Sequence, residues 1–340
     1  MKEPLDPPSF THLIDLAAER IGGQALVAND EFFAPKENLL KPGRGVFIPD
    51  KYTDRGKWMD GWESRRRRTP GHDWCIIELG LPGVIKGVDI DTNHFLGNHP
   101  PHASLDACRL PEGASVEEDA WTEILPKSPL EPGSQNLFAI DHEGCWTHVR
   151  LHIYPDGGVA RLKVYGEVTP DWSRHDPGAL IDLAAVEHGG LALTCSDRFF
   201  SHMMNLIMPG PPENMGDGWE TKRRRGPGYD WVIVRLGAAG HVQRLEVDTT
   251  HFKGNYPNQC SVEGGSFPEA DLDFLEGSEA KWTELLPKTK LQAHHRHIFE
   301  DELRDVGPVT HVRLNIYPDG GVARLRVFGT RVPPEDDVRF

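Results

Sequence analysis

The residues best suited to acid–base chemistry occur twice in the chain, each time in the same short segment. The sequence DGWE at residues 60–63 precedes four arginines, and DGWE at residues 217–220 precedes a matching basic run. A carboxylate can transfer protons, whereas a guanidinium can grip an anionic carboxylate through two parallel hydrogen bonds. An isolated arginine run usually marks a solvated surface. Because this run recurs behind the same acidic segment, we interpret both copies as sites for a small anion.

A second polar segment, DTNHFLGNHP at residues 91–100, follows an apolar stretch and has a counterpart at residues 248–257. Asp91 and His94 can form an acid–base pair, since histidine titrates near neutrality and a carboxylate can fix its tautomer. Two alternatives remain open: these side chains cap a turn, or they bind a divalent metal with Asn98 or His99. Metal binding ranks last, because the spacing lacks the specificity of a HExxH motif.

Both segments belong to an internal duplication. Residues 60–74 and 217–231 are identical at 11 of 15 positions, and residues 147–166 and 310–329 at 17 of 20. Each copy is about 150 residues long, which is enough for a core of its own. The sequence therefore predicts two homologous domains, residues 1–168 and 178–332, joined by a linker at residues 169–177.

The elements that must position these residues read mostly as strands. Apolar and polar residues alternate over residues 148–154 and 159–165, and Pro-Asp-Gly-Gly between them predicts a β-hairpin. Residues 74–80 and 84–90 predict a second strand pair around a Leu-Pro-Gly turn. One short helix is expected in each copy, near residues 13–20 and 180–187. This pattern favours an all-β, antiparallel sandwich over an α/β fold, which needs crossover helices.

Composition limits the possible partners. The net charge is −15, and an acidic surface opposes the phosphate backbone of nucleic acids. The five cysteines form no CxxC pair, so we expect neither a zinc site nor a disulfide framework. There is no signal-like apolar stretch near Met1 and no apolar run of about 18 residues, so no membrane association and a cytoplasmic location are expected.

Three motifs present in both halves carry a family resemblance: DGWExxRRR, DTxHFxGNxP and THVRLxIYPDGGVARL. Together they resemble the allantoicase family, and the likeness extends from about residue 14 to residue 329. The closing strands also resemble galactose-binding-like domains. The resemblance implies two tandem galactose-binding-like jelly-roll β-sandwich domains. It also implies a hydrolase that converts allantoate and water to ureidoglycolate and urea, with allantoate as its small-molecule partner.

The resemblance, set against this reaction, gives each candidate residue an expected role. Proton transfer is expected from Glu63, His94, Glu220 and His251. Binding of the substrate carboxylate is expected from Arg66, Arg67, Arg223 and Arg224, with Glu63 and Arg67 on one strand face by alternation. Hydrogen bonds to the ureido groups are expected from Asp60, Asp91, Asn98, Asp217, Asp248 and Asn255. No cofactor and no covalent nucleophile are required.

Two other functions remain open at this stage. A non-catalytic tandem module that binds a small acidic sugar or metabolite would explain the fold and the arginines. A metal-dependent hydrolase would use Asp91, His94 and His99. The copies also differ, since Tyr229 and Asn315 replace His72 and His152. The sequence does not choose the competent copy, and a homo-oligomer is compatible with it.

Overall fold

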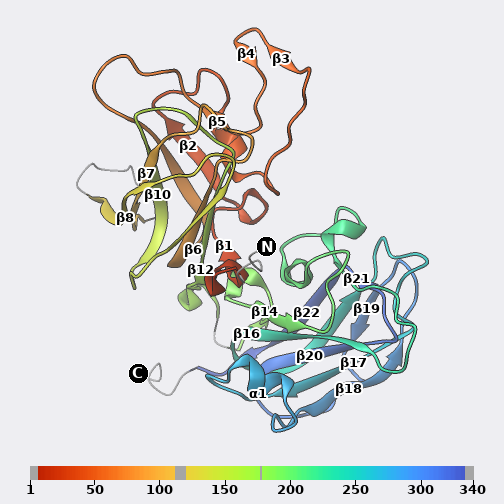
Figure 1. Cartoon of the computed structure of the whole chain (residues 1–340). Helices are drawn as coiled ribbons and strands as arrows, with labels where there is room; N and C mark the ends of the chain where they lie inside the picture. The colour runs from red at the N-terminus through yellow and green to blue at the C-terminus, as the bar shows by residue number, and fades with distance from the viewer. Residues whose placement is uncertain (1–6, 112–119, 177, 334–340) are drawn as a thin grey trace. The chain divides into compact units, whose positions relative to one another are not determined.

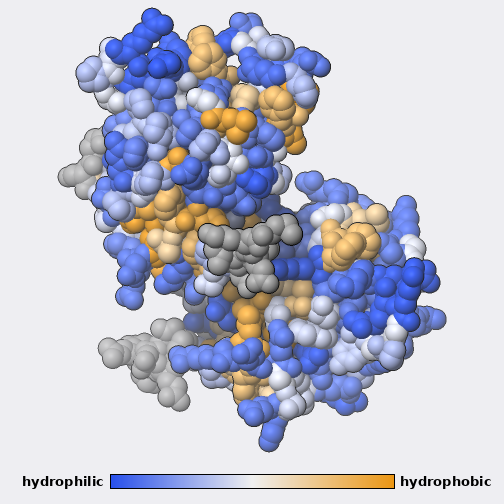
Figure 2. Space-filling model, viewed as in Figure 1, coloured by the Kyte–Doolittle hydropathy of each residue, from blue (hydrophilic) through white to orange (hydrophobic). Residues whose placement is uncertain are grey.

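The computed structural model describes residues 7–111, 120–176 and 178–333, and it divides the chain into two compact units (Figure 1). The N-terminal unit comprises residues 1–169 and the C-terminal unit residues 170–340. None of the helices in the described ranges is long and apolar enough to span a membrane. The face of the molecule seen in Figure 2 is largely hydrophilic, with scattered apolar patches.

Strands dominate both units. The strands of the N-terminal unit are β1 (Ile14–Asp15), β2 (Gln24–Ala28), β3 (Tyr52–Thr53), β4 (Gly56–Lys57), β5 (Trp62–Glu63), β6 (Asp73–Asp91), β7 (His102–Cys108), β8 (Thr122–Pro129), β9 (Gln135–Ala139), β10 (Cys145–Tyr154), β11 (Gly158–Val159) and β12 (Arg161–Val168). Its short 3-10 helices include Ser9–His12, Glu19–Ile21 and Lys36–Leu40.

Among the described residues, the C-terminal unit repeats this order without counterparts of β3 and β4 and with an added helix, α1. Its elements are β13 (Leu180–Asp182), β14 (Leu191–Cys195), β15 (Trp219–Glu220), β16 (Asp230–Asp248), β17 (Gln259–Gly265), α1 (Leu272–Glu276), β18 (Thr283–Lys290), β19 (Arg296–Phe299), β20 (Val309–Tyr317), β21 (Gly321–Val322) and β22 (Arg324–Arg331). Its 3-10 helices are Trp172–Arg174, Val186–His188, Met203–Ile207 and Met215–Asp217. The predicted all-β class is confirmed.

One long strand in each unit joins the two layers of the sandwich. The first part of β6 pairs with β2 and β10, and β10 continues the layer to β7 and β8. The last part of β6 pairs with β9 and β12, and β12 continues to β1. Fully buried side chains such as Ile77, Leu151 and Val164 fill the core. In the C-terminal unit β16 takes the place of β6.

The predicted strand pair at residues 74–90 is wrong, because Leu81-Pro82-Gly83 lies inside β6 and is not a turn. Opposite it, the register of β10 shifts between Trp146 and His148. A proline is tolerated at such an irregularity, since no regular ladder hydrogen bond is lost. A Cβ atom on Gly83 would lie 2.4 Å from the carbonyl oxygen of Glu167, so close strand packing explains this glycine.

The predicted hairpin at residues 148–165 is also wrong. β10 and β12 do not pair with each other; each pairs with β6, on different parts of that strand. Residues 155–158 therefore form a link between the layers, and β11 within this link pairs with β5. A Cβ atom on Gly158 would lie 2.0 Å from the ring of Phe95. The glycine is needed for this close approach.

The short helices predicted near residues 13–20 and 180–187 are replaced by a strand and a 3-10 turn in each unit. β1 and β13 pair with the edges of β12 and β22. Leu16 and Ala17, which suggested a helix face, are fully buried beside β1. Pairing with the sheet buries the same apolar residues that a helix would have buried. Tertiary packing therefore decided the local structure.

We expect the Gly158→Ala variant to lower the free energy of unfolding by about 1–3 kcal/mol, because the added methyl group overpacks the ring of Phe95. Gly97→Ala is the matched control, since no atom lies within 4 Å of its Cβ position. Urea denaturation of both variants measures the difference. Equal midpoints for Gly158→Ala and Gly97→Ala would show that the link is not tightly packed.

Candidate active site

Glu63 is held at one end of the N-terminal sandwich by pairing on both sides. β5 pairs with β11 through Glu63 and Gly158, and Ala34 forms a bridge to Glu63 from the other side. The side chain of Asn98 donates a hydrogen bond of 2.7 Å to Oε1 of Glu63. Burial raises the pKa of Glu63, and the hydrogen bond from Asn98 opposes this effect only in part. The pKa of this carboxyl group therefore lies above the usual value for glutamate.

The C-terminal unit has the same arrangement. Glu220 lies opposite Gly321 in the pairing of β15 with β21, and Asn255 donates a hydrogen bond to its carboxylate. The backbone of Asn255 also accepts a hydrogen bond of 2.8 Å from Gly321. Each candidate glutamate is therefore in direct contact with a candidate asparagine, although the two residues are 35 positions apart in both units.

Asp60 and Asp217 are engaged with arginines inside their own units. Arg161, only 2% exposed, donates to Asp60 at 2.8 Å, and the buried Arg324 donates to Asp217 at 2.7 Å. Burial favours a higher pKa for Asp60, but the hydrogen bonds from Arg161 and Val46 outweigh it and lower that pKa. These ionised aspartates thus hold the backbone below the end of each sandwich where Glu63 and Glu220 lie, which we call the rim.

The loop that begins at Asp91 has an unusual backbone at His94, where φ is 70°. Histidine is among the residues that tolerate this left-handed region. Phe95, fully buried, anchors the loop, and Asp91 caps it by accepting the backbone N–H of Asn93 at 2.9 Å. The turn-capping role considered from the sequence is therefore present, and the exposed rim carries His94 stacked on Phe47 with ring centres 5.5 Å apart.

His251, the counterpart of His94, has the same backbone geometry with φ of 73° but a different partner. Its Nε2 lies 2.9 Å from the carbonyl oxygen of Pro212. A carbonyl only accepts, so this nitrogen carries the proton and Nδ1 is left as the basic nitrogen. The two histidines are therefore placed alike and are oriented by different neighbours.

The arginine run is divided between internal pairs and exposed side chains. Arg67 pairs with the buried Asp73 at 2.7 Å, and Arg65 pairs with Asp30 at 2.7 Å. Arg66 is exposed, and within the described residues no ion pair involves it. The expectation that strand alternation places Glu63 and Arg67 on one face is wrong, because β5 ends at Glu63.

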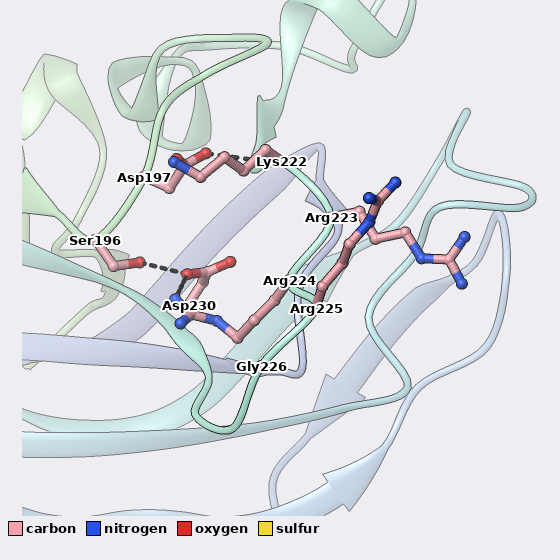
Figure 3. Close-up of a pocket in the computed structure, with 8 residues that line it drawn as sticks. All are labelled: Ser196, Asp197, Lys222, Arg223, Arg224, Arg225, Gly226 and Asp230. Carbon is pink, nitrogen blue, oxygen red and sulfur yellow. Dashed lines mark hydrogen bonds and ion pairs between the residues drawn. The ribbon is translucent and has the colours of Figure 1, made fainter.

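A hollow of about 320 Å³ follows the corresponding run in the C-terminal unit (Figure 3). Arg224 points to Asp230 and Lys222 to Asp197, whereas Arg223 and Arg225 point away from both aspartates. Lys222 and Arg224 therefore hold the loop in place through ion pairs, whereas Arg223 and Arg225 point outward.

A hydrogen-bonded chain of titratable groups, which the sequence analysis did not find, lies on the N-terminal unit. His152 Nε2 is 2.8 Å from Oδ2 of Asp106, and His152 Nδ1 is 2.9 Å from Nε2 of His72. Burial alone would raise the pKa of Asp106, but hydrogen bonds from His152 and Arg150 lower it. Asp106 is therefore ionised, and Nε2 of His152 lies between this carboxylate and Nε of Arg150, which donates to the same nitrogen at 3.1 Å.

This chain makes His72 the outer end of a proton relay. Nδ1 of His152 and Nε2 of His72 share one hydrogen bond, in which either nitrogen can be the donor. Burial lowers the pKa of His72, and the nearby charges of His152 and Arg67 lower it further. In the C-terminal unit Asn315 donates to Glu263 at 2.9 Å instead, and an amide does not relay protons.

The proposed metal ligands do not converge. Asp91 binds Arg44 and His94 stacks on Phe47. Throughout the described parts of the chain, no group of three or more His, Cys, Asp or Glu side chains is arranged to hold a metal ion. The absence of a cofactor remains a prediction.

Comparison with known proteins agrees with the duplicated architecture. The family described as "Allantoicase repeat" matches residues 14–169 and 181–332. A probable allantoicase of Pseudomonas aeruginosa is 53% identical over 321 residues, covering 94% of this chain and 97% of that protein. Probable allantoicase 1 of Burkholderia mallei is 52% identical, covering 95% and 96%.

A solved structure extends the likeness to three dimensions. The crystal structure of allantoicase from Saccharomyces cerevisiae has a TM-score of 0.79 and 38% identity, and the match covers 93% of this chain and 92% of that one. The fold and these relatives define a tandem β-sandwich hydrolase. The chain belongs to the allantoicase family. The resemblance stated from its motifs is thereby confirmed, as is the expected hydrolase function.

We expect the His72 ring to titrate below 6.5, the usual value for histidine, and the His152→Asn variant to raise its midpoint by removing the competing imidazole charge. NMR titration of the histidine ring signals measures both. Because the folded pKa is depressed, His72 contributes stability at neutral pH that is lost as the pH falls from 6.5 through its folded midpoint.

His241→Asn is the control for this measurement, since His241 is exposed on β16 of the other unit. It should leave the His72 signal unchanged. A His72 midpoint at or above 6.5, or one that does not respond to His152→Asn, would rule out the relay.

Proposed function

We propose that the rim of each sandwich, at Glu63 and at Glu220, is where allantoate is hydrolysed to ureidoglycolate and urea. The reaction breaks the bond between the central carbon of allantoate and one ureido nitrogen, and it forms a bond from that carbon to a water oxygen. The departing nitrogen needs a proton, and the attacking water must lose one. A single carboxyl group can perform both transfers in sequence.

Glu63 is suited to be this group. Its protonated form gives a proton to the departing ureido nitrogen while the lone pair of the remaining ureido nitrogen expels urea, leaving an acyl-imine. The carboxylate then accepts a proton from the water that adds to the imine carbon. Burial, which raises the pKa of Glu63, supports the first step because it increases the protonated fraction near neutral pH. Asn98 holds the carboxyl group in place.

His94 and His251 are the second proton-transfer group in this proposal. Their shared left-handed backbone presents the imidazole at the rim, and the buried rings of Phe95 and Phe252 fix the loop below. A histidine here can take the N–H proton that the remaining ureido group must lose when the imine forms. The histidine returns this proton to the same nitrogen when water adds to the imine carbon, so protons and charges balance without a covalent intermediate.

The substrate carboxylate is assigned to the outward arginines, Arg66 and Arg223. Arg67 and Arg224 hold the same loop through Asp73 and Asp230, so we assign them to positioning as well as to the field that attracts the anion. Asp248, Asn98 and Asn255 remain the proposed hydrogen-bond partners of the ureido groups. Asp60, Asp217 and Asp91 are held by Arg161, Arg324 and Arg44, so we assign them to positioning.

The observation that carries the proposal is the recurrence, in both units, of a glutamate bonded to an asparagine beside a histidine-bearing loop. Burial raises the pKa of Glu63 in the N-terminal unit, and a non-catalytic binding module has no need for this shift. No metal cofactor is part of the proposal, since Asp91 and His94 have other partners. The proposed location is the cytoplasm, in keeping with five free cysteines, and the acidic net charge opposes nucleic acid as a partner.

Substitution of the glutamates tests the proposal. We expect Glu63→Gln and Glu220→Gln each to reduce urea release from allantoate, and the double variant to lower kcat by at least about 100-fold, the usual contribution of a general acid or base. Unchanged thermal unfolding would show that the fold is intact. Full activity in the double variant would exclude these residues, and no urea release from the unmodified protein would favour the binding module.

The outward arginines are tested separately. We expect the Arg66→Ala/Arg223→Ala double variant to raise KM for allantoate about tenfold or more with little change in kcat, because a charge-assisted contact to the carboxylate is lost in ground state and transition state alike. Arg68→Ala/Arg225→Ala is the matched control from the same run, exposed in both units. Equal KM values for the two double variants would place the carboxylate elsewhere.

A further inference from the structure

A second hollow, of about 440 Å³, lies in the C-terminal unit at the end of β16. Its lining includes Asp248, Thr250, Arg296 and the loop residues Pro211 and Pro212. Asp248 is 9% exposed, and its Oδ1 accepts the backbone N–H of Thr250 at 2.7 Å. Within the described residues, no side chain donates a hydrogen bond to this carboxylate, which faces the hollow.

The equivalent carboxylate of the N-terminal unit is occupied. Asp91 accepts two parallel hydrogen bonds from Arg44, one of 2.7 Å from Nε to Oδ2 and one of 3.0 Å from Nη2 to Oδ1. The side-chain amide of Asn93 donates to the backbone carbonyl of Arg44 at 2.9 Å and keeps the arginine in position. Asp91 is consequently 1% exposed.

The difference arises from a single loop. Residues 41–45 read Lys-Pro-Gly-Arg-Gly, and the corresponding residues 208–212 read Met-Pro-Gly-Pro-Pro, so Pro211 stands where Arg44 stands. Thr250 replaces Asn93 and has no amide group to hold an arginine. A loop that closes the site in one unit thus leaves it open in the other.

The contact of Arg44 with Asp91 shows which ligand the open site fits. The Nε–H and one Nη2–H bond of an arginine point in the same direction and meet the two oxygens of one carboxylate. A monosubstituted urea, R–NH–CO–NH2, presents the same fork: its N–H and one N–H of its NH2 group are parallel and lie opposite the carbonyl oxygen. Arg44 therefore has the donor pattern of a ureido group.

We propose that Asp248 binds a ureido group of the substrate in this hollow, and that Arg44 occupies the corresponding position in the N-terminal unit as an internal substitute. Arg296, whose side chain is 60% exposed at the rim of the hollow, is placed to meet the anionic end of the same molecule. Its own partner Glu246 leaves part of the guanidinium accessible. The ligand class rests on the proposed function; the contrast between the two units does not.

The proposal predicts a binding stoichiometry. N-carbamoylglycine, which carries one ureido group and one carboxylate, is the probe, and isothermal titration calorimetry on the full chain is the measurement. We expect one site per chain for this probe, because Arg44 already fills the ureido position of the N-terminal unit. Asp248→Asn should weaken binding at least tenfold, because the amide presents N–H groups to the donors of the ureido group. Pro211→Arg should weaken binding by placing a competing guanidinium beside Asp248, and Pro211→Arg/Thr250→Asn should abolish it by restoring both residues that close the N-terminal site. Arg44→Ala should raise the stoichiometry toward two.

Asp301→Asn is the matched control, since Asp301 is exposed in a turn of the same unit. This variant should bind the probe as tightly as the unmodified protein does. Thermal unfolding confirms that Pro211→Arg folds, and Asp248→Asn tests the same site without a change of backbone. No heat from the unmodified protein, or unchanged affinity in Asp248→Asn, would overturn the proposal. Unchanged stoichiometry in Arg44→Ala would overturn the assignment of Arg44.

The same preparations assayed for urea release separate this inference from the proposed function. If the probe binds in the expected pattern and no urea forms from allantoate, the ureido site stands and the proposed reaction fails. If urea forms while Asp248→Asn binds the probe normally, the reaction stands and the ureido site fails.

Discussion

The close approach between the link after β10 and the loop after β6 determines where chemistry is possible in each unit. A Cβ atom on Gly157 would lie 2.7 Å from the carbonyl oxygen of Asn98, and Gly158 donates to that same oxygen at 2.8 Å. Because β11 also pairs with β5, Glu63 is brought to Asn98 by the same contact. Gly321, Asn255 and Glu220 repeat it in the C-terminal unit. The site is thus a consequence of backbone packing that only glycine permits, and the neighbouring loops can change length without moving it.

The fold class could be predicted because alternation of apolar and polar residues is a local property of each strand. The connections could not. Pro155 to Gly158 has the composition of a hairpin turn, yet its glycines are required by Phe95 and by the loop at residues 98–100. Leu81-Pro82-Gly83 likewise looks like a turn and lies inside a strand. In both cases the glycines are present because another part of the chain packs closely against them. A single sequence does not show which atoms lie opposite a glycine.

The candidate site was predicted to the extent that its residues share a motif. Glu63 and Asn98 were both selected, each from a repeated block, and the structure brings them into contact. Arg44 was missed because it lies in a loop that the C-terminal unit does not reproduce, so the duplication gave no signal for it. The relay of Asp106, His152 and His72 depends on strand register, which spacing does not reveal. Its one trace in the sequence was the joint change to Asn315 and Tyr229.

The two units show how a buried carboxylate can exchange an internal partner for an external one. Removal of one member of a buried ion pair costs several kcal/mol, since the remaining charge is left without compensation. The loss of the arginine in the shorter C-terminal loop is therefore tolerable only if other cations replace it. Arg296 stands opposite Asp248 in the pairing of β16 with β19, where Gln135 stands opposite Asp91 in the other unit. A cation on the sheet thus stands near this carboxylate in place of the cation on the loop, and the open side of the carboxylate is left free for a neutral donor. In a duplicated protein, one domain can replace the internal arginine by an external ligand while the other domain keeps its aspartate bound to an arginine.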